Sequence, residues 1–251
     1  MDVTTLALVA MAGVAGGAMN ALAGGGTFAT LPALLAAGVP ANVANATSNV
    51  ALLPGAATSA WTFRDELGPV GGVDHRLLAA ITFAGGLVGS WLLVVTPGAT
   101  FDVIVPWLVL YAFVVLAFGR RASSWLAERV TIGARTLVVA QALLGVYGGY
   151  FGGGVGLMTT ATYGLLASIS PRAMFAPRTL MLAVANAAAA LVFVASGMVE
   201  WRYCLPMLVG AVAGGWGGAV LGKRIPERAV RAWTLAVTGV TAAVFFWRAY
   251  G

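Results

Sequence analysis

The sequence predicts an all-α polytopic membrane protein made of two inverted-topology repeats, and three observations support this. The first is composition: 60% of the 251 residues are hydrophobic and only 9% are charged, whereas a soluble domain carries about 25% charged residues. The second is that no Asp, Glu, Lys or Arg occurs between Val3 and Phe63. That stretch is about three times the ~20 residues that a membrane helix needs. The chain therefore has too few charges to cover a water-soluble surface.

The third observation is an internal repeat, which divides the chain into two similar halves. Gly24-Gly25-Gly26 recurs as Gly152-Gly153-Gly154, and Gly85-Gly86-x-x-Gly89 recurs as Gly214-Gly215-x-x-Gly218. These matches predict a first repeat over residues 1–120, a cytoplasmic linker over 121–134 and a second repeat over 135–251.

Each half is expected to begin with a glycine-tipped segment and to continue with three membrane crossings. The crossings of the first half are predicted over Ala41–Phe63, Leu77–Val95 and Phe101–Gly119. The arms that follow the glycine triplets are short, roughly 11 residues for Thr27–Ala37 and roughly 14 for Val155–Ser168. At about 1.5 Å per residue, the shorter arm covers about 16 Å of a roughly 30 Å membrane core. This favours hairpins with tips near the midplane and leaves two full crossings as the alternative.

The distribution of positive charge predicts how the halves are oriented, because cytoplasmic loops are enriched in Lys and Arg. The uncharged turns at Gly38–Pro40 and Thr96–Thr100 and the Gly197–Arg202 turn are expected outside. The basic residues expected inside are Arg120, Arg121, Arg129, Arg135, Lys223, Arg224, Arg228 and Arg231, with Arg172 and Arg178 inside or near it. These assignments agree only if the two halves insert in opposite directions, which is typical of secondary transporters.

The two glycine tips are the strongest candidates for a binding site. Helices are expected to start directly after them, at Thr27 and Val155, and a helix N-terminus offers free N–H groups and a partial positive charge to an anion. The alternative is that glycines only allow close helix packing. We prefer that alternative for Gly85/Gly89 and Gly214/Gly218. For the two triplets we prefer a binding role, because packing alone does not require consecutive glycines.

Polar residues inside the charge-free spans complete the candidate site. Arg178 is expected at membrane depth, where a cation is costly unless it has a role. Its guanidinium geometry suits an oxyanion. The alternative is that its side chain snorkels to the cytoplasmic surface. The Asn and Thr side chains could instead form hydrogen bonds between helices. The candidate substrate-binding residues are Asn20, Gly24, Gly25, Gly26, Thr27, Asn45, Thr47, Asn49, Gly152, Gly153, Gly154, Arg178 and Asn186.

Several other functions are disfavoured by what the sequence lacks. It contains no nucleotide-binding Gly-x-x-x-x-Gly-Lys-Ser/Thr motif, and its single histidine (His75) and single cysteine (Cys204) cannot build a metal site. We therefore expect no cofactor, no metal and no enzymatic activity. The net charge of +6 is better explained by basic cytoplasmic loops than by nucleic-acid binding.

Two stretches resemble the signatures of the TauE/SafE family of sulfite exporters. They are Asn20-Ala-Leu-Ala-Gly-Gly-Gly-Thr-Phe, continuing through Leu31-Pro32 to Ala44-Asn45-Ala46-Thr47, and Gly148-Gly-Tyr-Phe-Gly-Gly-Gly-Val-Gly156. The resemblance implies a multi-pass protein of the bacterial inner membrane that transports sulfur-containing oxyanions, usually as an exporter. The family often has a lysine near the position of Arg178, which supports a cationic role there.

The leading hypothesis is thus a secondary transporter that exports sulfite or an organosulfonate by alternating access. The expected partners are a small anionic substrate and the lipid bilayer, and exposed Gly-x-x-x-Gly faces permit a homodimer without requiring one. A passive anion channel is the main alternative, and a membrane subunit that only anchors partners is a third.

Overall fold

The computed structural model describes residues 3–127, 133–167, 173–222 and 226–251, and their regular structure is helical apart from one backbone bridge between Val70 and Val73. The all-helical prediction is confirmed. In chain order the elements are α1 (Val3–Leu22), α2 (Thr27–Ala36), α3 (Ala41–Thr62), η1 (Arg64–Glu66), α4 (His75–Val95), α5 (Gly98–Ala127), α6 (Ala134–Tyr150), α7 (Val155–Ala167), α8 (Phe175–Ala195), α9 (Trp201–Gly222) and α10 (Glu227–Tyr250).

Both glycine triplets interrupt a helix, as predicted. The chain leaves α1 after Leu22 and re-enters a helix at Thr27, and it does the same between α6 and α7. The cause is backbone conformation: φ is +80° at Gly24, +73° at Gly152 and +78° at Gly154, a region that residues with a Cβ rarely adopt. The helices after the breaks have 10 and 13 residues, about 15 and 20 Å long. Each is too short to cross a membrane core of roughly 30 Å.

Six helices of the described residues are long and apolar enough to span a membrane: α1, α4, the Gly98–Gly119 part of α5, α8, α9 and the Arg228–Tyr250 part of α10. The chain is thus a multi-pass membrane protein. Helix α3 is as long, with 22 residues, but it carries Asn45, Thr47, Ser48 and Asn49 in its first half. All four are buried, so the polar face of α3 points into the protein.

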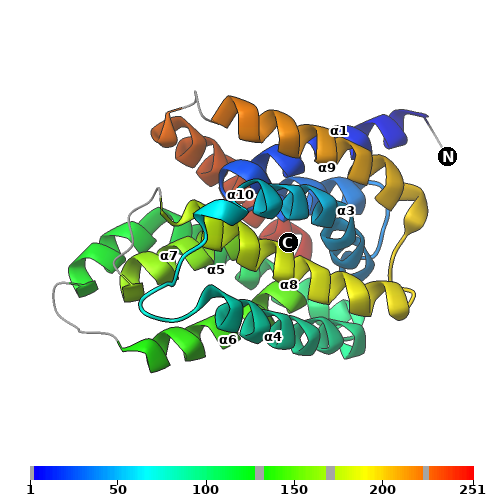
Figure 1. Ribbon diagram of the computed structural model, residues 1–251. Coiled ribbons are helices and arrows are strands. Elements are labelled where there is room, and N and C mark those ends of the chain that lie inside the picture. The colour runs from blue at the N-terminus through cyan, green and yellow to red at the C-terminus, as the bar shows by residue number, and fades with distance from the viewer. Residues whose placement is uncertain (1–2, 128–132, 168–172, 223–225) are drawn as a thin grey trace.

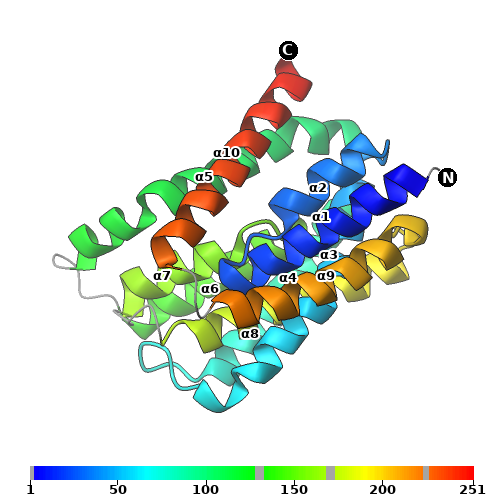
Figure 2. The same cartoon turned by 90° about the horizontal axis from the view of Figure 1, so that it is seen from above.

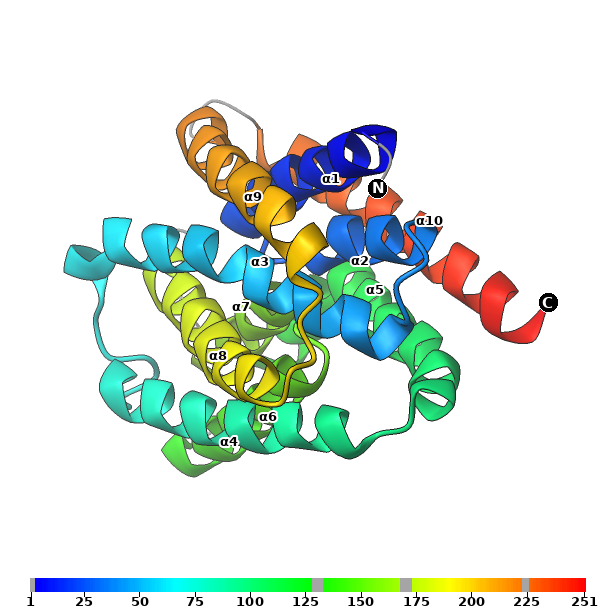
Figure 3. The same ribbon diagram turned by 90° about the vertical axis from the view of Figure 1, so that its right-hand side faces the viewer.

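The most extensive helix contacts join the two halves, although helices such as α1, α2 and α3 also contact one another within a half. Helix α1 lies along α9 at one side of the molecule and α4 lies along α6 at the other, with α3 and α8 between them (Figures 1 and 3). Helices α5 and α10 contact each other at the back of this arrangement (Figure 2). Every one of these contacts has its counterpart in the other half, because α1 corresponds to α6 and α4 to α9 in the sequence repeat. Opposite insertion of the halves in a membrane stays a prediction; Arg129, Arg172, Lys223 and Arg224, on which it partly depends, lie outside the described residues.

Glycines bring the paired helices into direct backbone contact. A Cβ at Gly214 would overlap the carbonyl oxygen of Val14 on α1, and a Cβ at Gly89 would overlap that of Val146 on α6. A Cβ at Gly85 would likewise lie 2.8 Å from the carbonyl oxygen of Ala142, and a Cβ at Gly218 would lie 2.8 Å from the Cα of Ala18. The packing interpretation of the Gly-x-x-x-Gly patterns is therefore confirmed.

We expect Gly214→Ala to lower the free energy of unfolding by about 1–3 kcal/mol, because α1 and α9 must move apart to admit the methyl group. Gly217→Ala is the matched control, since no atom lies within 4 Å of a Cβ there; it should raise stability by up to about 1 kcal/mol through helix propensity. Thermal unfolding of both variants in detergent measures the difference. Equal midpoints would show that this contact does not hold α1 and α9 together.

Candidate substrate site at the two helix breaks

The two glycine tips touch each other in the middle of the fold. A Cβ on Gly24 would lie 2.5 Å from the Cα of Gly156, and a Cβ on Gly156 would lie 2.7 Å from the Cα of Gly24. A Cβ on Gly154 would lie 3.1 Å from the ring of Phe28, which follows the first tip. The breaks at the starts of α2 and α7 therefore belong to one site.

The first tip is closed by its own hydrogen bonds. Asn20 Oδ1 accepts a bond from the backbone N–H of Gly26 at 2.7 Å, which caps the start of α2. Thr30 Oγ1 donates to the carbonyl of Gly26 at 3.2 Å and also bonds the hydroxyl of Ser48 on α3. Thr27, the first residue of α2, is buried. The N–H of Gly26, one of the candidate binding residues, is thus occupied by a side chain.

The second tip is held by aromatic residues and by α3. The hydroxyl of Tyr147 donates to the carbonyl of Gly153 at 2.8 Å, and the ring of Phe151 lies 6.3 Å from that of Phe28. Asn45 Nδ2 donates to the carbonyl of Tyr150 at 3.1 Å. Asn49 is adjacent, with its Nδ2 2.5 Å from the position that a Cβ on Gly152 would take. Asn45 and Asn49 of α3 therefore both face the second tip.

Buried polar atoms without a partner gather on the helices that form or contact the tips. Such atoms are rare in folded proteins, because leaving them unsatisfied costs about 1–3 kcal/mol each. Among the described residues they are Asn20 Nδ2, Asn45 Oδ1, Asn49 Nδ2 and Oδ1, Thr159 Oγ1, Arg178 Nε and, away from the tips on α10, Arg231 Nε. This unused hydrogen-bonding capacity makes the region around the tips the candidate binding site.

A polar cluster elsewhere in the core shows the opposite pattern. Gln141 on α6 donates to the hydroxyl of Thr82 at 2.7 Å and accepts from the hydroxyl of Tyr163 at 2.8 Å. Thr82 in turn donates to the carbonyl of Leu78 at 2.7 Å. The bonds of Gln141 to Thr82 and Tyr163 join α6 to α4 and α7 and serve helix packing. Where buried polar groups serve packing in this cluster, the protein thus provides them with partners.

Arg178 lies beside the first tip and binds the end of α1. Its guanidinium donates to the carbonyls of Ala21 and Leu22 at 3.3 and 3.4 Å and lies 4.5 Å above the centre of the Phe175 ring. Only 7% of the residue is exposed, which is the opposite of a snorkelling side chain. Within the described residues no carboxylate lies at ion-pair distance from Arg178. Its positive charge faces the negative end of the α1 dipole instead.

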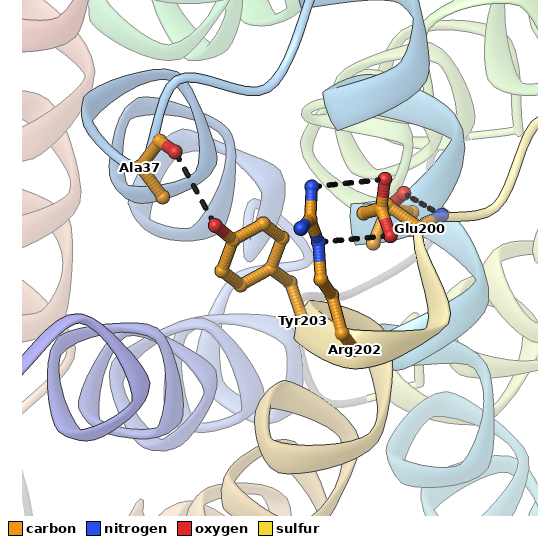
Figure 4. A network of polar contacts seen from close by, with 5 residues as sticks. Ala37, Glu200, Arg202 and Tyr203 are labelled. Atoms are coloured by element: carbon orange, nitrogen blue, oxygen red, sulfur yellow. Dashed lines mark hydrogen bonds and ion pairs between the residues drawn. The ribbon is translucent and has the colours of Figure 1, made fainter. Parts of the chain in front are cut away.

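Thr47 lies away from the tips. Its hydroxyl accepts a hydrogen bond from the backbone N–H of Glu200, just before α9, at 2.9 Å. At the same end Tyr203 donates to the carbonyl of Ala37 at 3.4 Å, and Arg202 pairs with Glu200 at 3.1 Å (Figure 4). The bond of Tyr203 to Ala37 brings the end of the Gly197–Arg202 turn next to the Gly38–Pro40 turn. Both turns were predicted to face outward.

Asn186 is buried on α8, and no side-chain hydrogen bond ties it to the tips in the described residues. Thr159 on α7 was not among the candidates, because a threonine in an apolar helix usually bonds its own backbone, as Thr160 does with the carbonyl of Gly156 at 2.8 Å. The signal that singles out Thr159 is its buried, unpartnered hydroxyl.

The combination of apolar spanning helices with two broken helix pairs that meet inside the protein is typical of membrane transporters. The chain belongs to the TauE/SafE family: the family model described as "Sulfite exporter TauE/SafE" matches residues 9–245.

Curated relatives are named as transporters as well. The chain is 28% identical to the "Probable membrane transporter protein YfcA" of Escherichia coli (strain K12) over 94% of its own length and 87% of the relative's. It is also 28% identical to a "Probable membrane transporter protein" of Haemophilus influenzae, with 85% and 84% of the two chains covered. No solved structure matches the chain.

Proposed function

We propose that this protein is a secondary transporter of the bacterial inner membrane that exports a small sulfur-containing oxyanion, either sulfite or an organosulfonate, and that it is not an enzyme. The observation that carries the proposal is the meeting of the two broken helices at Gly24 and Gly156, surrounded by buried polar atoms without partners. The name of the matched family provides the substrate class.

The chemistry of the tips suits an oxyanion. The first N–H groups of a helix have no partner within that helix and favour negative charge. At α7 the amide of Met158 donates to the carbonyl of Gly154, and the N–H groups before it are free to face a ligand. Arg178 contributes positive charge on the other side of the contact between the tips. Neutral donors and one cation together hold an anion without a metal.

Alternating access requires the contact between the tips to open towards one side at a time. The contacts of α1 with α9 and of α4 with α6 are backbone-to-backbone and tight, so we assign each pair to a rigid unit. The motion then takes place between these units, along α3 and α8. Substrate bound at the tips would face the cytoplasm in one arrangement and the outside in the other.

Flux measurements on the purified protein in liposomes test the proposal. Vesicles loaded with radiolabelled sulfite should release it with saturable kinetics, and unlabelled sulfite outside should accelerate the release by exchange. Flux that rises linearly with concentration, without exchange, would identify a passive channel instead. Arg178→Ala and Gly25→Leu should abolish the flux, whereas Gly217→Ala on α9 should retain it; unchanged flux in the first two variants would refute the site.

A further inference from the structure

The buried asparagines of α3 have hydrogen-bonding capacity that the protein does not use. Asn45 and Asn49 are four residues apart and thus share one helix face, and they are 0% and 2% exposed. That face meets the second tip, because Asn45 bonds the carbonyl of Tyr150 and Asn49 lies against Gly152. Both amides therefore lie beside the break between α6 and α7.

The chemistry of their partners determines which atoms remain free. The group that Asn45 meets at Tyr150 is a carbonyl, which can only accept, so Asn45 must present Nδ2 to it and keep Oδ1 unused. Asn49 has no partner for either amide atom. The face of α3 thus offers a ligand two acceptor oxygens, Asn45 Oδ1 and Asn49 Oδ1, and one amide nitrogen without a partner, Asn49 Nδ2. The N–H groups in the first turn of α7 add donors only.

At the first tip the free atom is a donor. The backbone N–H of Gly26 can only donate, so Asn20 must present Oδ1 to it, and its Nδ2 is left unpartnered. The site therefore has donors at both tips, and among the described residues its unpartnered atoms that can only accept are Asn45 Oδ1 and Asn49 Oδ1, because the hydroxyl of Thr159 can either donate or accept. An oxyanion that only accepts hydrogen bonds would satisfy the donors and leave two buried carbonyl oxygens unsatisfied.

We infer that the site selects an oxyanion that carries its own O–H or N–H group, so that the ligand donates to Asn45 Oδ1 or Asn49 Oδ1 while its oxygens face the amides of α7. Two sources have this chemistry: hydrogen sulfite, the singly protonated form of sulfite, and a sulfonate with a hydroxyl or amino group near the sulfur. The inference rests on the proposed transport of sulfur oxyanions. It adds that a singly charged form with a donor hydrogen is the one that binds.

A matched pair of sulfonates tests the donor requirement by calorimetry on the detergent-purified protein. 2-Hydroxyethanesulfonate and propane-1-sulfonate have the same charge and nearly the same size, and differ by a hydroxyl in place of a methyl group. We expect the hydroxyl compound to bind at least ~10-fold more tightly, since a buried acceptor would otherwise stay unpaired. Equal affinities would overturn the inference but not the transport function, whereas failure of sulfite and both sulfonates to bind would overturn both.

Sulfite itself forms the second arm of this test. Its apparent affinity should fall as the pH rises through its second ionisation, because the proton that donates to the asparagines is lost. The affinity for 2-hydroxyethanesulfonate should stay constant over the same range, since its hydroxyl does not ionise there. Tighter binding of sulfite at the higher pH would contradict the inference.

Asn49→Leu separates a binding role from a structural one. The substitution removes two unsatisfied buried atoms, so the unfolding midpoint of the ligand-free protein should rise while the preference for 2-hydroxyethanesulfonate falls at least ~10-fold. Gln141→Leu is the control, because both amide atoms of Gln141 have partners; its midpoint should fall and the preference should remain. An Asn49→Leu protein that is destabilised and keeps the preference would show that Asn49 serves packing only.

Discussion

Replacing Gly24 by alanine should abolish transport and lower the free energy of unfolding by about 2–5 kcal/mol. Two costs add at this position. The φ of +80° costs a residue with a Cβ about 1–2 kcal/mol, and the new methyl group would lie 2.5 Å from the Cα of Gly156, an overlap that costs about 1–3 kcal/mol. The neighbour is backbone, which cannot rotate away, so the two tips must separate.

Two matched variants divide this effect into its parts. Gly38 has a φ of +83° and nothing within 4 Å of a Cβ, so Gly38→Ala carries the backbone strain alone. It should cost about 1–2 kcal/mol and retain transport. Gly156→Ala carries the overlap alone, because its Cβ would lie 2.7 Å from the Cα of Gly24 and its φ is not positive. It should lose transport with a smaller loss of stability than Gly24→Ala.

Liposome flux and thermal unfolding measured on the three variants decide the interpretation. If the tips meet at the transport site, loss of flux follows the overlap and not the backbone strain. Normal flux in both Gly24→Ala and Gly156→Ala would show that the contact is a peripheral feature of the fold. A Gly38→Ala protein without flux would show that general destabilisation is enough to stop transport.

Features that depend on the backbone alone were predictable from the sequence. Three glycines in a row weaken a membrane helix enough to favour a break, and the breaks after Leu22 and Tyr150 lie at residues 24–26 and 152–154, whereas the pairs Gly85-Gly86 and Gly214-Gly215 stay inside α4 and α9. The spacing of Gly85 and Gly89 likewise predicts a close contact of helices. In such cases the physical cause lies within a few residues of its effect, and no knowledge of the partner is needed.

Features that depend on long-range partners were not predictable. The sequence treats the two triplets as equivalent, but Asn20 closes the first tip while Asn49 leaves the second tip open. Whether a buried asparagine finds a partner can depend on a segment far away in the chain, as for Asn45, which bonds the carbonyl of Tyr150, 105 positions later. The same reason explains Thr47, which shares a helix with Asn45 and Asn49 but bonds the backbone of Glu200.

Replacing Arg178 by glutamine should reduce flux at limiting substrate concentration by at least ~10-fold. Glutamine can still donate to the carbonyls of Ala21 or Leu22, but it lacks the positive charge. A charged hydrogen bond contributes about 1.5–3 kcal/mol, and about 1.4 kcal/mol corresponds to a tenfold change in binding. Arg178→Lys keeps the charge and loses the planar geometry, so its flux should lie between those of the glutamine variant and the unmodified protein.

The dependence of flux on substrate concentration separates the two roles that the geometry gives Arg178. If its charge balances the anion, the substitutions raise KM in the order Lys, then Gln, and the unfolding midpoints of the two variants stay close together. If Arg178 only holds the end of α1 through Ala21 and Leu22, the unfolding midpoints of its variants fall and KM is unchanged. Arg202→Gln is the control for charge in general, because Arg202 is exposed and pairs with Glu200; it should leave both KM and the midpoint unaltered. The absence of an ion-pair partner for Arg178 among the described residues favours the first outcome, because its charge is then not neutralised by a carboxylate of the protein and is available to an anion.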